Sequence, residues 1–564
     1  MDFNKTILSQ LTSQFSIAGE LTVSRPPKEN MGDFCISCFK LSVDSITVPV
    51  KIAQYIHENL NLPIGGLVKE TKVIGPYVNF FLDRNVVIHS VIDEILIAKE
   101  RYGSKGQGDD KQLLIEHTSI NPNASPHIGR ARNSIIGDFL SRLFTFVGYD
   151  VQRHYFINDI GKQISMLVYA LDYLSIPLTE VTFQQMLDLY IKINEESTKH
   201  PEIEQKVFDQ LELLENGDNV IRDKFKRITD ICVEGQTKIF NRMGISFDVF
   251  THESDFVFGD KINPILDCLK QKGRLKEDAI GRLYVDLSGY DIPTKEPVLV
   301  LTRENKTSLY PLRDIAYTVY KMKINPQHNF IVLGEDQEVY MQQISAVLDI
   351  LGYPTPILTS YSFVLLKEGK MSTRLGRVVL LEEFIDAMMA ELKDGFAKRG
   401  TIHDDKTIEQ IASSCIKYNI LNVHRKRNVV FDMSEATNVQ GDSAVFILYN
   451  YARINSILNR CNFDVSSLPA SDVQLDNDLE YSLVSDLSDF PDIIDSLLVS
   501  RESVTLIKYL YSLTQKFSRY YSAVPILLEV DEHVRQSRLI LLYCLKTVMK
   551  TGMEIIGVTP MEKF

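Results

Sequence analysis

The sequence predicts an α/β protein built around a parallel sheet, with a small α+β unit before it and an all-α bundle after it. Between residues 113 and 366, short apolar runs alternate with amphipathic helical patterns, as in βαβ units. Beyond about residue 405, strand patterns nearly vanish and amphipathic helices follow one another. The 564 residues exceed one ordinary core, so several domains are expected.

Composition indicates a globular protein without a membrane partner. Hydrophobic residues make up 45% of the chain and charged residues 24%. No apolar run reaches the roughly 18 to 20 residues of a membrane span, and the first residues lack a secretory pattern, so we expect a cytoplasmic protein. The net charge of −13 discourages indiscriminate nucleic-acid binding, but a selective RNA partner needs only a local basic surface.

Residues 1–105 form the α+β unit. Helical patterns at 2–18 and 48–60 flank a turn-rich stretch, and a strand at 75–82 follows a Gly-Pro turn. The glycine-rich tract 101–112 is the expected linker, which puts a boundary near 105.

The seven scattered cysteines argue against a disulfide framework. Only Cys35 and Cys38 are close, and no second pair at zinc-ligand spacing follows nearby. We therefore interpret both as small core residues and expect no structural zinc.

Residues 106–405 form the parallel-sheet domain. A strand at 113–117, a helix over 135–147 and a strand at 151–157 make a βαβ unit. Further strands are expected at 297–302, 329–333 and 361–366, and a helical insertion at about 161–240. Residues 406–564 form the bundle, with helices at 445–458, 504–524 and 533–556. Sites in parallel sheets lie at the carboxyl ends of strands.

The stretch "SINPNASPHIGRARNSIIGD" (119–138) places polar chemistry at the start of a helix. Two prolines hold the connection extended, and Gly129 lets a flat ligand approach the backbone. A helix start favours an anion such as phosphate, to which His127 can donate a hydrogen bond. The alternative is that His127 only caps the helix.

A second cluster supports phosphate binding. "LLKEGKMSTRLGRVV" (365–379) places Lys370, Ser372, Thr373 and Arg374 between two glycines after a strand. Alone, such a loop is more often a solvated turn. Together with the histidine–glycine helix start, it indicates a nucleotide site.

A third group is acidic. Tyr310 and Asp314 lie four residues apart on one helix, and "GEDQ" (334–337) follows a strand end. With Glu116 at the end of the first strand, these residues predict an acid-lined pocket beside the phosphates. Such a pocket suits a cationic substrate coupled to a nucleotide.

These motifs resemble those of the arginyl-tRNA synthetases, a family of class I aminoacyl-tRNA synthetases. "HIGR" is similar to the class signature His-x-Gly-His, and "KMSTR" to the Lys-Met-Ser-Lys-Ser loop. "EHTSINPN", "SLYPLRDIAY", "FDVFTHES" and "GEDQ" resemble segments of the arginine enzymes. The resemblance extends to "PPKENMGDF" and "GPYVNF" in the N-terminal unit and to "NVQGDSAVFILYNYARI" in the bundle.

The resemblance implies a Rossmann-type catalytic domain, an N-terminal added domain that contacts the tRNA elbow, and a helical anticodon-binding domain. It implies that L-arginine and ATP, with Mg²⁺, give arginyl-adenylate and pyrophosphate, after which the arginyl group moves to the terminal adenosine of tRNA(Arg). It further implies a monomer, and activation that depends on bound tRNA.

It also assigns roles by position. The catalytic residues are His127, Arg130, Lys370 and Arg374. The ATP-binding residues are His127, Gly129, Gly334, Asp336, Lys370, Met371 and Ser372. The arginine-binding residues are Glu116, Asn121, Tyr310, Asp314 and Gln337. A guanidinium, with five donors in a rigid fork, requires carboxylate acceptors of this kind.

For tRNA, Tyr77 and Asn79 match positions that meet the elbow, although packing in a strand is an equal alternative for Tyr77. In the basic run 424–427, Arg425, Lys426 and Arg427 either follow backbone phosphates or form a solvated face. Tyr449 and Arg453 are candidates for the anticodon loop, against the alternative that helical aromatics belong to the core.

Two positions depart from the class pattern. Arg130 replaces the second signature histidine, and Thr373 replaces the second loop lysine, whose charge Arg374 can supply. The rival functions are a catalytically silent tRNA-binding paralogue and another adenylyl-transferring enzyme. The intact acidic group argues against the first, and "KMSTR" with the helical bundle argues against the second.

Overall fold

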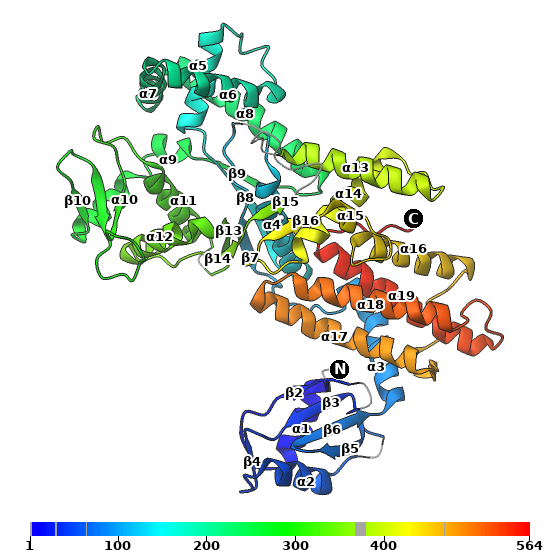
Figure 1. The fold of residues 1–564 in the computed structure, drawn as a ribbon. Helices are drawn as coiled ribbons and strands as arrows, with labels where there is room; N and C mark the ends of the chain where they lie inside the picture. Colours follow the sequence, from blue (N-terminus) through cyan, green and yellow to red (C-terminus); the bar gives the residue numbers. More distant parts are fainter. Residues whose placement is uncertain are drawn as a thin grey trace.

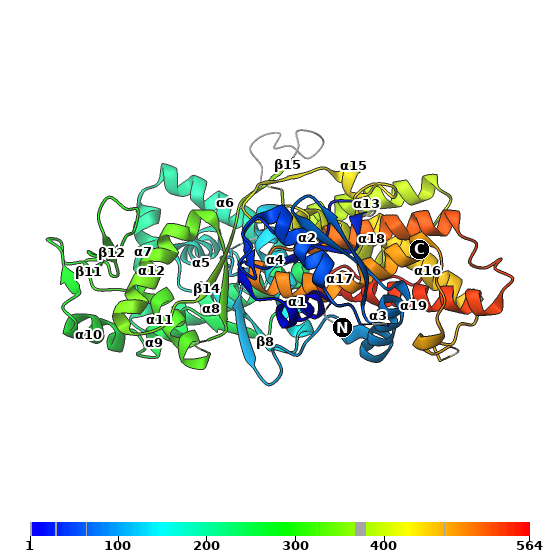
Figure 2. The ribbon, with the colours of Figure 1, turned by 90° about the horizontal axis from the view of Figure 1, so that it is seen from below.

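The protein folds into three regions that follow one another along the chain (Figure 1). The computed structural model describes residues 3–28, 31–63, 65–123, 125–325, 327–366, 379–466 and 468–564. The N-terminal unit lies beside the C-terminal helices, and two further lobes extend from the central sheet away from those helices (Figure 2). Within the described ranges, no helix is long and apolar enough to cross a membrane.

The N-terminal unit is a four-stranded antiparallel sheet in the order β2-β3-β6-β5, packed with two helices. Its elements are α1 (Phe3–Gln14), β1 (Ile17–Gly19), β2 (Val23–Ser24), β3 (Phe34–Ser37), β4 (Leu41–Val43), α2 (Pro49–Asn59), β5 (Val68–Ile74) and β6 (Tyr77–Leu82). The two helices and the strand expected here are α1, α2 and β6. Cys35 and Cys38 are both buried in this core, as the sequence interpretation requires.

Residues 101–112, the expected linker, are packed against the C-terminal helices. They follow α3 (Arg84–Ala98) and η2 (Lys99–Arg101) and pack on α17 (Asp478–Ser500). The Tyr102 hydroxyl donates to the carbonyl of Leu487 at 3.1 Å, and its ring stacks on Phe490 with centroids 6.2 Å apart. Gly103 has a φ of +94°, and a Cβ there would lie 2.8 Å from the Phe490 ring, so this glycine serves close packing.

The central sheet has five parallel strands in the order β14-β13-β7-β8-β9. They are β7 (Gln112–Glu116), β8 (Asp150–Ile157), β9 (Val249–His252), β13 (Asn329–Gly334) and β14 (Ile357–Tyr361), and helix α4 (Ile128–Phe146) connects β7 to β8. The chain leaves β7 towards β8 and β9 and returns on the other side of β7 as β13 and β14. The strand order therefore reverses between β7 and β13, where ligands of such sheets bind.

Two of the expected strands belong elsewhere. The run 297–302 contains β12 (Val298–Val300), which lies in a separate antiparallel sheet with β10 (Leu275–Glu277) and β11 (Leu283–Asp286). The run 361–366 is divided: β14 ends at Tyr361, and β15 (Val364–Leu366) leaves to pair with β16 (Val429–Phe431). An apolar run indicates a buried strand but does not select its partner.

Two lobes interrupt the sheet. The insertion between β8 and β9 is helical, as predicted, and consists of α5 (Lys162–Leu174), α6 (Phe183–Lys199), α7 (Glu202–Glu215) and α8 (Asn219–Arg242). The second lobe precedes and follows β13 and includes α9 (Ser254–Phe258), α10 (Asn263–Gln271), β10–β12, α11 (Tyr310–Ile324), η3 (Glu335–Gln337) and α12 (Glu338–Leu351). Each lobe has its own hydrophobic core.

The C-terminal region is a helical bundle. Besides α17, it contains α14 (Asp405–Leu421), α15 (Met433–Ala436), α16 (Ala444–Arg460), η4 (Ala470–Asp472), α18 (Val504–Ala523) and α19 (Glu532–Ile555). Helix α13 (Leu381–Lys398) precedes the boundary expected near 405 but packs on α14. The expected helices correspond to α16, α18 and α19. Helix α17 was missed because it carries many aspartates and an internal Pro491, although an apolar stripe, including Leu483, Leu487, Phe490, Ile494 and Leu497, is buried.

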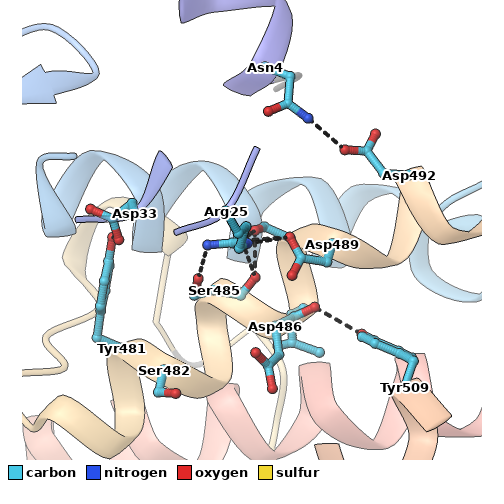
Figure 3. Close-up of polar contacts among 12 residues, drawn as sticks. Asn4, Arg25, Asp33, Tyr481, Ser482, Ser485, Asp486, Asp489, Asp492 and Tyr509 are labelled. Atoms are coloured by element: carbon cyan, nitrogen blue, oxygen red, sulfur yellow. Dashed lines mark hydrogen bonds and ion pairs between the residues drawn. The ribbon is translucent and has the colours of Figure 1, made fainter. Parts of the chain in front are cut away.

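The N-terminal unit docks on α17 through polar contacts (Figure 3). The Arg25 guanidinium donates to the Asp489 carboxylate at 2.5 and 3.0 Å and to the Ser485 hydroxyl at 2.8 Å. Asn4 donates to Asp492, and the Tyr481 hydroxyl donates to Asp33 at 2.7 Å. These partly exposed pairs orient the unit more than they stabilise it.

A buried ion pair joins α4 to the bundle. The Lys417 ammonium lies 2.9 Å from the Asp138 carboxylate, both side chains are almost fully buried, and Arg142 binds the same carboxylate at 2.9 Å. Burial opposes ionisation, but the two cations hold the pKa of Asp138 below its usual value.

We predict that Lys417→Met destabilises the protein by about 2 to 4 kcal/mol, because it leaves a buried carboxylate with one partner instead of two. Thermal unfolding should show a clear fall in Tm. Lys398→Met, which breaks the exposed pair with Asp394, is the matched control and should leave Tm nearly unchanged. Equal Tm values for the two variants would contradict the role of the buried pair.

Candidate active site

The candidate site lies at the carboxyl ends of β7 and β13, where the strand order reverses. Directly after β7, Thr118 and Ser119 adopt positive φ angles of 70° and 39°. Side chains of α4 hold this strained turn: Asn133 accepts from the Thr118 N–H, and Thr118 donates to the Ser134 hydroxyl at 2.8 Å. Asn133 also donates to the carbonyl of Val332 on β13 at 2.8 Å. Strain maintained in this way is typical of functional loops.

His127 is the N-cap residue of α4, but its side chain makes no capping hydrogen bond. The start of α4 therefore does not use the ring as a cap. Burial, and secondarily the charge of Arg130, lower the pKa of the imidazole, so it is neutral near pH 7. The backbone here pairs with the segment after residue 378: Ile128 N–H donates to the carbonyl of Val379 at 3.1 Å, and Leu381 N–H to that of Pro126 at 2.7 Å.

The glycines and charges expected to serve ATP lie around this helix start. A Cβ at Gly129 would lie 2.9 Å from Nδ1 of His127, so a side chain there would displace the imidazole. A Cβ at Gly334 would lie 2.3 Å from the Asp336 carboxylate. Arg130 and Asp336 are exposed, and both charges act on the Tyr361 phenol, whose pKa is raised mainly by burial. The two residues thus come from α4 and η3 to one edge of the sheet.

Lys370, Met371, Ser372 and Arg374 lie outside the described residues. The flanking segments are described, and both contact α4. Val379 binds the helix start through its carbonyl, and Ser362 and Phe363, which precede β15, bind Arg132.

Arg132 connects three segments. Its side chain is fully buried, and its guanidinium donates to the carbonyls of Ser362 at 2.5 Å, Phe363 at 3.3 Å, Arg427 at 2.7 Å and His424 at 3.2 Å. Burial lowers its pKa to about 10, so it stays charged at neutral pH. In this stretch, sequence reasoning assigned a role only to Arg130 and did not identify the structural role of Arg132.

One member of the acidic group is neutralised by a lysine of the protein itself. Glu116 is buried and paired with the Lys321 ammonium, whose exposed fraction is 0%. Lys321 also lies 4.3 Å from the centre of the Tyr317 ring. The spacing of the sequence could have predicted that Lys321 lies on this face of α11. The residues that follow its i, i+4, i+7, i+11 spacing are Tyr310, Asp314, Tyr317 and Lys321.

In contrast to Glu116, Asp314 has no cation bonded to it among the described residues. It accepts from the Tyr340 hydroxyl at 2.8 Å, and burial, followed by the Glu116 charge, raises its pKa to about 6. Tyr310 is 56% exposed, and its ring lies 5.4 Å from that of Tyr340. An acid partly desolvated beside two aromatic rings suits a flat cation such as guanidinium.

The two amides expected near the substrate lie at the same edge. The Asn121 residue is exposed, and its main-chain carbonyl accepts from the Gln236 side chain of α8 at 3.0 Å. Gln337 is exposed, and its side chain donates to Asp336 at 3.0 Å. The site therefore collects Glu116, Asn121, His127, Asp314, Asp336 and Gln337 around the ends of β7 and β13.

The basic run 424–427 lies at the sheet edge, not far out on the bundle. Arg425 pairs with Glu502 at 2.7 Å and donates to the carbonyl of Ser360 at 3.3 Å. Lys426 pairs with Glu338. Arg427 is exposed. Two of the three cations are thus engaged within the protein.

The other tRNA candidates are divided between surface and core. Tyr77 is exposed and contacts Phe39 edge to face at 6.0 Å, whereas Asn79 is 3% exposed and donates to the carbonyl of Lys72. On α16, the Arg453 guanidinium lies between the Tyr449 and Tyr521 rings, 4.6 and 4.7 Å from their centres. Tyr449 and Arg453 line a surface cavity of about 340 Å³ with Phe564.

Among the described residues, no group of three or more His, Cys, Asp or Glu is arranged to hold a metal ion.

Sequence reasoning missed two buried groups near the site: Arg313 pairs with Glu253 at 2.5 Å, and burial raises the pKa of Glu253 to about 7. Glu253 lies in the quoted "FDVFTHES" segment, but sequence alone gave it no partner.

Three family models match the chain in order. "Arginyl tRNA synthetase N terminal domain" matches residues 3–82, "tRNA synthetases class I (R), catalytic domain" matches 91–433, and "DALR anticodon binding domain" matches 447–564. Among solved structures, the arginyl-tRNA synthetase of Thermus thermophilus has a TM-score of 0.79 at 24% identity and covers 100% of this chain and 99% of that one. That of Plasmodium falciparum has a TM-score of 0.79 at 20% identity, covering 99% and 97%.

Sequence relatives agree. The arginine–tRNA ligase of Methanocaldococcus jannaschii is 33% identical over 573 residues, which cover 99% of each chain. That of Methanococcus aeolicus is 31% identical over 554 residues, covering 95% of each. Because family models and relatives together span nearly the whole chain, the protein belongs to the arginyl-tRNA synthetase family of class I tRNA synthetases.

Proposed function

We propose that the protein is an arginine–tRNA ligase. A carboxylate oxygen of L-arginine attacks the α-phosphorus of ATP, the bond to the β-phosphate breaks, and pyrophosphate leaves. The terminal 2′-hydroxyl of tRNA(Arg) then attacks the carbonyl carbon of arginyl-adenylate and releases AMP. The observation that carries this proposal is the meeting, at one edge of the sheet, of the His127–Gly129 helix start and the acid-bearing face of α11.

For ATP, His127 and Arg130 donate to the α-phosphate as charge develops, while Gly129 and Gly334 leave room for the nucleotide and Asp336 faces its sugar or base. Lys370, Met371, Ser372 and Arg374 meet the β- and γ-phosphates, with Mg²⁺ as part of the ATP substrate. Because positioning and electrostatics suffice for this step, no protein nucleophile is required.

For arginine, Asp314 accepts the guanidinium beside Tyr310. Glu116 supports that pocket together with Lys321, and Asn121 and Gln337 face the α-amino and carboxyl groups. Charge balance supports Asp314 as the acid that lies closest to the guanidinium. Lys321 already neutralises Glu116, so the substrate cation compensates Asp314.

For tRNA, we infer elbow contacts by Tyr77 and Asn79, phosphate contacts by Arg425, Lys426 and Arg427, and anticodon contacts by Tyr449 and Arg453. The exposed Tyr77 ring and the Tyr449–Arg453–Tyr521 stack support base stacking. Because Asn79 is buried on the same strand as Tyr77, its part in the elbow contact is to support the position of Tyr77. We also infer a cytoplasmic monomer.

His127→Ala should lower arginine-dependent ATP–pyrophosphate exchange by about 10²- to 10³-fold, because it removes a donor to the transition state. The tRNA dissociation constant should stay within about two-fold. Exchange measured with and without tRNA, and filter binding of tRNA, check both statements. His200→Ala, an exposed histidine of the insertion, is the control. Undiminished exchange in His127→Ala would remove the histidine from the reaction.

The pKa of about 6 predicts how arginine binding depends on pH. Only the ionised Asp314 attracts the guanidinium, so the KM for arginine should rise by about ten-fold between pH 7 and pH 5 as the carboxyl takes up a proton. The KM for ATP in the same assays should change much less.

Asp314→Asn should raise the KM for arginine at pH 7 by about 100-fold and abolish this pH dependence. Asp349→Asn is the matched control, because Asp349 also accepts from a tyrosine hydroxyl, that of Tyr290 at 2.6 Å, but outside the site. An arginine KM that retains its pH dependence in Asp314→Asn would assign the titration to another group.

A further inference from the structure

The segment 424–427, which we call the basic connector, joins the helical bundle to the site edge of the parallel sheet. It lies between α14 and β16. On the sheet side, the Arg425 carbonyl accepts from the Ser362 N–H at 2.8 Å, its guanidinium donates to the Ser360 carbonyl, and Lys426 pairs with Glu338 at the start of α12. The connector therefore contacts the ends of β14 and η3.

On the bundle side, one carboxylate holds the same connector. Glu502 lies in the turn between α17 and α18, binds Arg425 at 2.7 Å and approaches His424 at 3.1 Å. The next residue, Ser503, donates to the carbonyl of Leu421 at the end of α14 at 2.8 Å. A shift of the α17–α18 turn would therefore move the connector with it.

Arg132 fixes the connector to the helix that carries His127. Its donors reach carbonyls on both sides, at residues 362–363 and at residues 424 and 427. The hydroxyl of Ser362 in turn donates to Glu335, the residue next to Asp336. A planar guanidinium binds several acceptors in fixed directions, so a displaced connector changes the position of β14 and η3 relative to α4.

We propose that Arg132 and the basic connector transmit the state of the anticodon-binding bundle to the nucleotide edge of the active site, with Arg132 as a positioning residue and Glu502 as the contact on the bundle. This inference rests on the proposed function, since it concerns how tRNA bound to the bundle changes the site for ATP.

The contacts differ in how easily they rearrange. The Asp138–Lys417 pair also joins α4 to the bundle, but it is buried, and breaking it leaves an uncompensated charge. The Glu502 contacts lie nearer to solvent: the side chains of Glu502 and His424 are 13% and 47% exposed. The Arg425–Glu502 pair, with side chains 21% and 13% exposed, is therefore less deeply buried than the Asp138–Lys417 pair and costs less to rearrange, as a switching contact requires.

The first experiment is Glu502→Gln, which keeps the size of the side chain and removes its charge. We expect the effect of saturating tRNA(Arg) on ATP–pyrophosphate exchange, measured as kcat and as the KM for ATP, to shrink by about three- to thirty-fold. Exchange without tRNA, the tRNA dissociation constant and Tm should remain near wild type. Asp495→Asn is the matched control, because Asp495 belongs to α17 and pairs with Lys105 instead of the connector.

The second experiment compares Arg132→Lys, Arg132→Met and the double variant Arg132→Lys/Glu502→Gln. We expect both single variants to raise the KM for ATP and to reduce the tRNA effect, lysine less than methionine. The double variant should be no worse than Arg132→Lys alone, because both residues act on one connector. A purely structural arginine would lower kcat and Tm in parallel and leave the tRNA effect as a ratio unchanged.

The outcomes separate the two proposals. A wild-type protein without arginine-dependent exchange under any condition overturns the proposed function. Normal exchange in Glu502→Gln with an unaltered tRNA effect overturns only the connector, as does a wild-type protein whose exchange does not respond to tRNA, or strictly additive effects in the double variant.

Discussion

The arrangement of the active site depends on one buried guanidinium. Arg132 is surrounded by backbone carbonyls, and no other side chain presents five donors in one plane. An uncompensated charge at this depth would be costly, so the carbonyls must stay where the guanidinium can reach them. The start of α4, the segment before β15 and residues 424–427 are therefore fixed to one another. These contacts also position His127, which precedes the first residue of α4.

Many charged side chains of this protein are paired with one another, so the number of acids and bases does not show which charges are available to a partner. The chain is acidic overall, yet its densest basic run is largely satisfied by Glu502 and Glu338. In the candidate site, Lys321 pairs with Glu116, whereas no described cation is bonded to Asp314. Under the proposed function, the guanidinium of the substrate supplies the cation for Asp314 that Lys321 supplies for Glu116.

Much of the fold was predictable because it depends on local periodicity. The βαβ unit over 113–157, the helical insertion and α16, α18 and α19 follow from apolar spacing. The failures occurred where a tertiary partner decides. The strand at 298–300 joins another sheet, the run 361–366 divides between two sheets, and α17 hides its apolar stripe behind aspartates and a proline.

By itself, the sequence determined the fold class and the family, and it named the candidate residues for the chemistry, because motifs at helix starts and strand ends are local in the chain. Only the tertiary structure decided which of those residues are engaged with one another. It buried Arg132 and Asn79, paired Glu116 with Lys321 and brought 424–427 to the sheet edge. Contacts between residues 65 to 295 positions apart, such as those of Arg425, Lys321 and Arg132, depend on how whole elements pack, which no local pattern encodes.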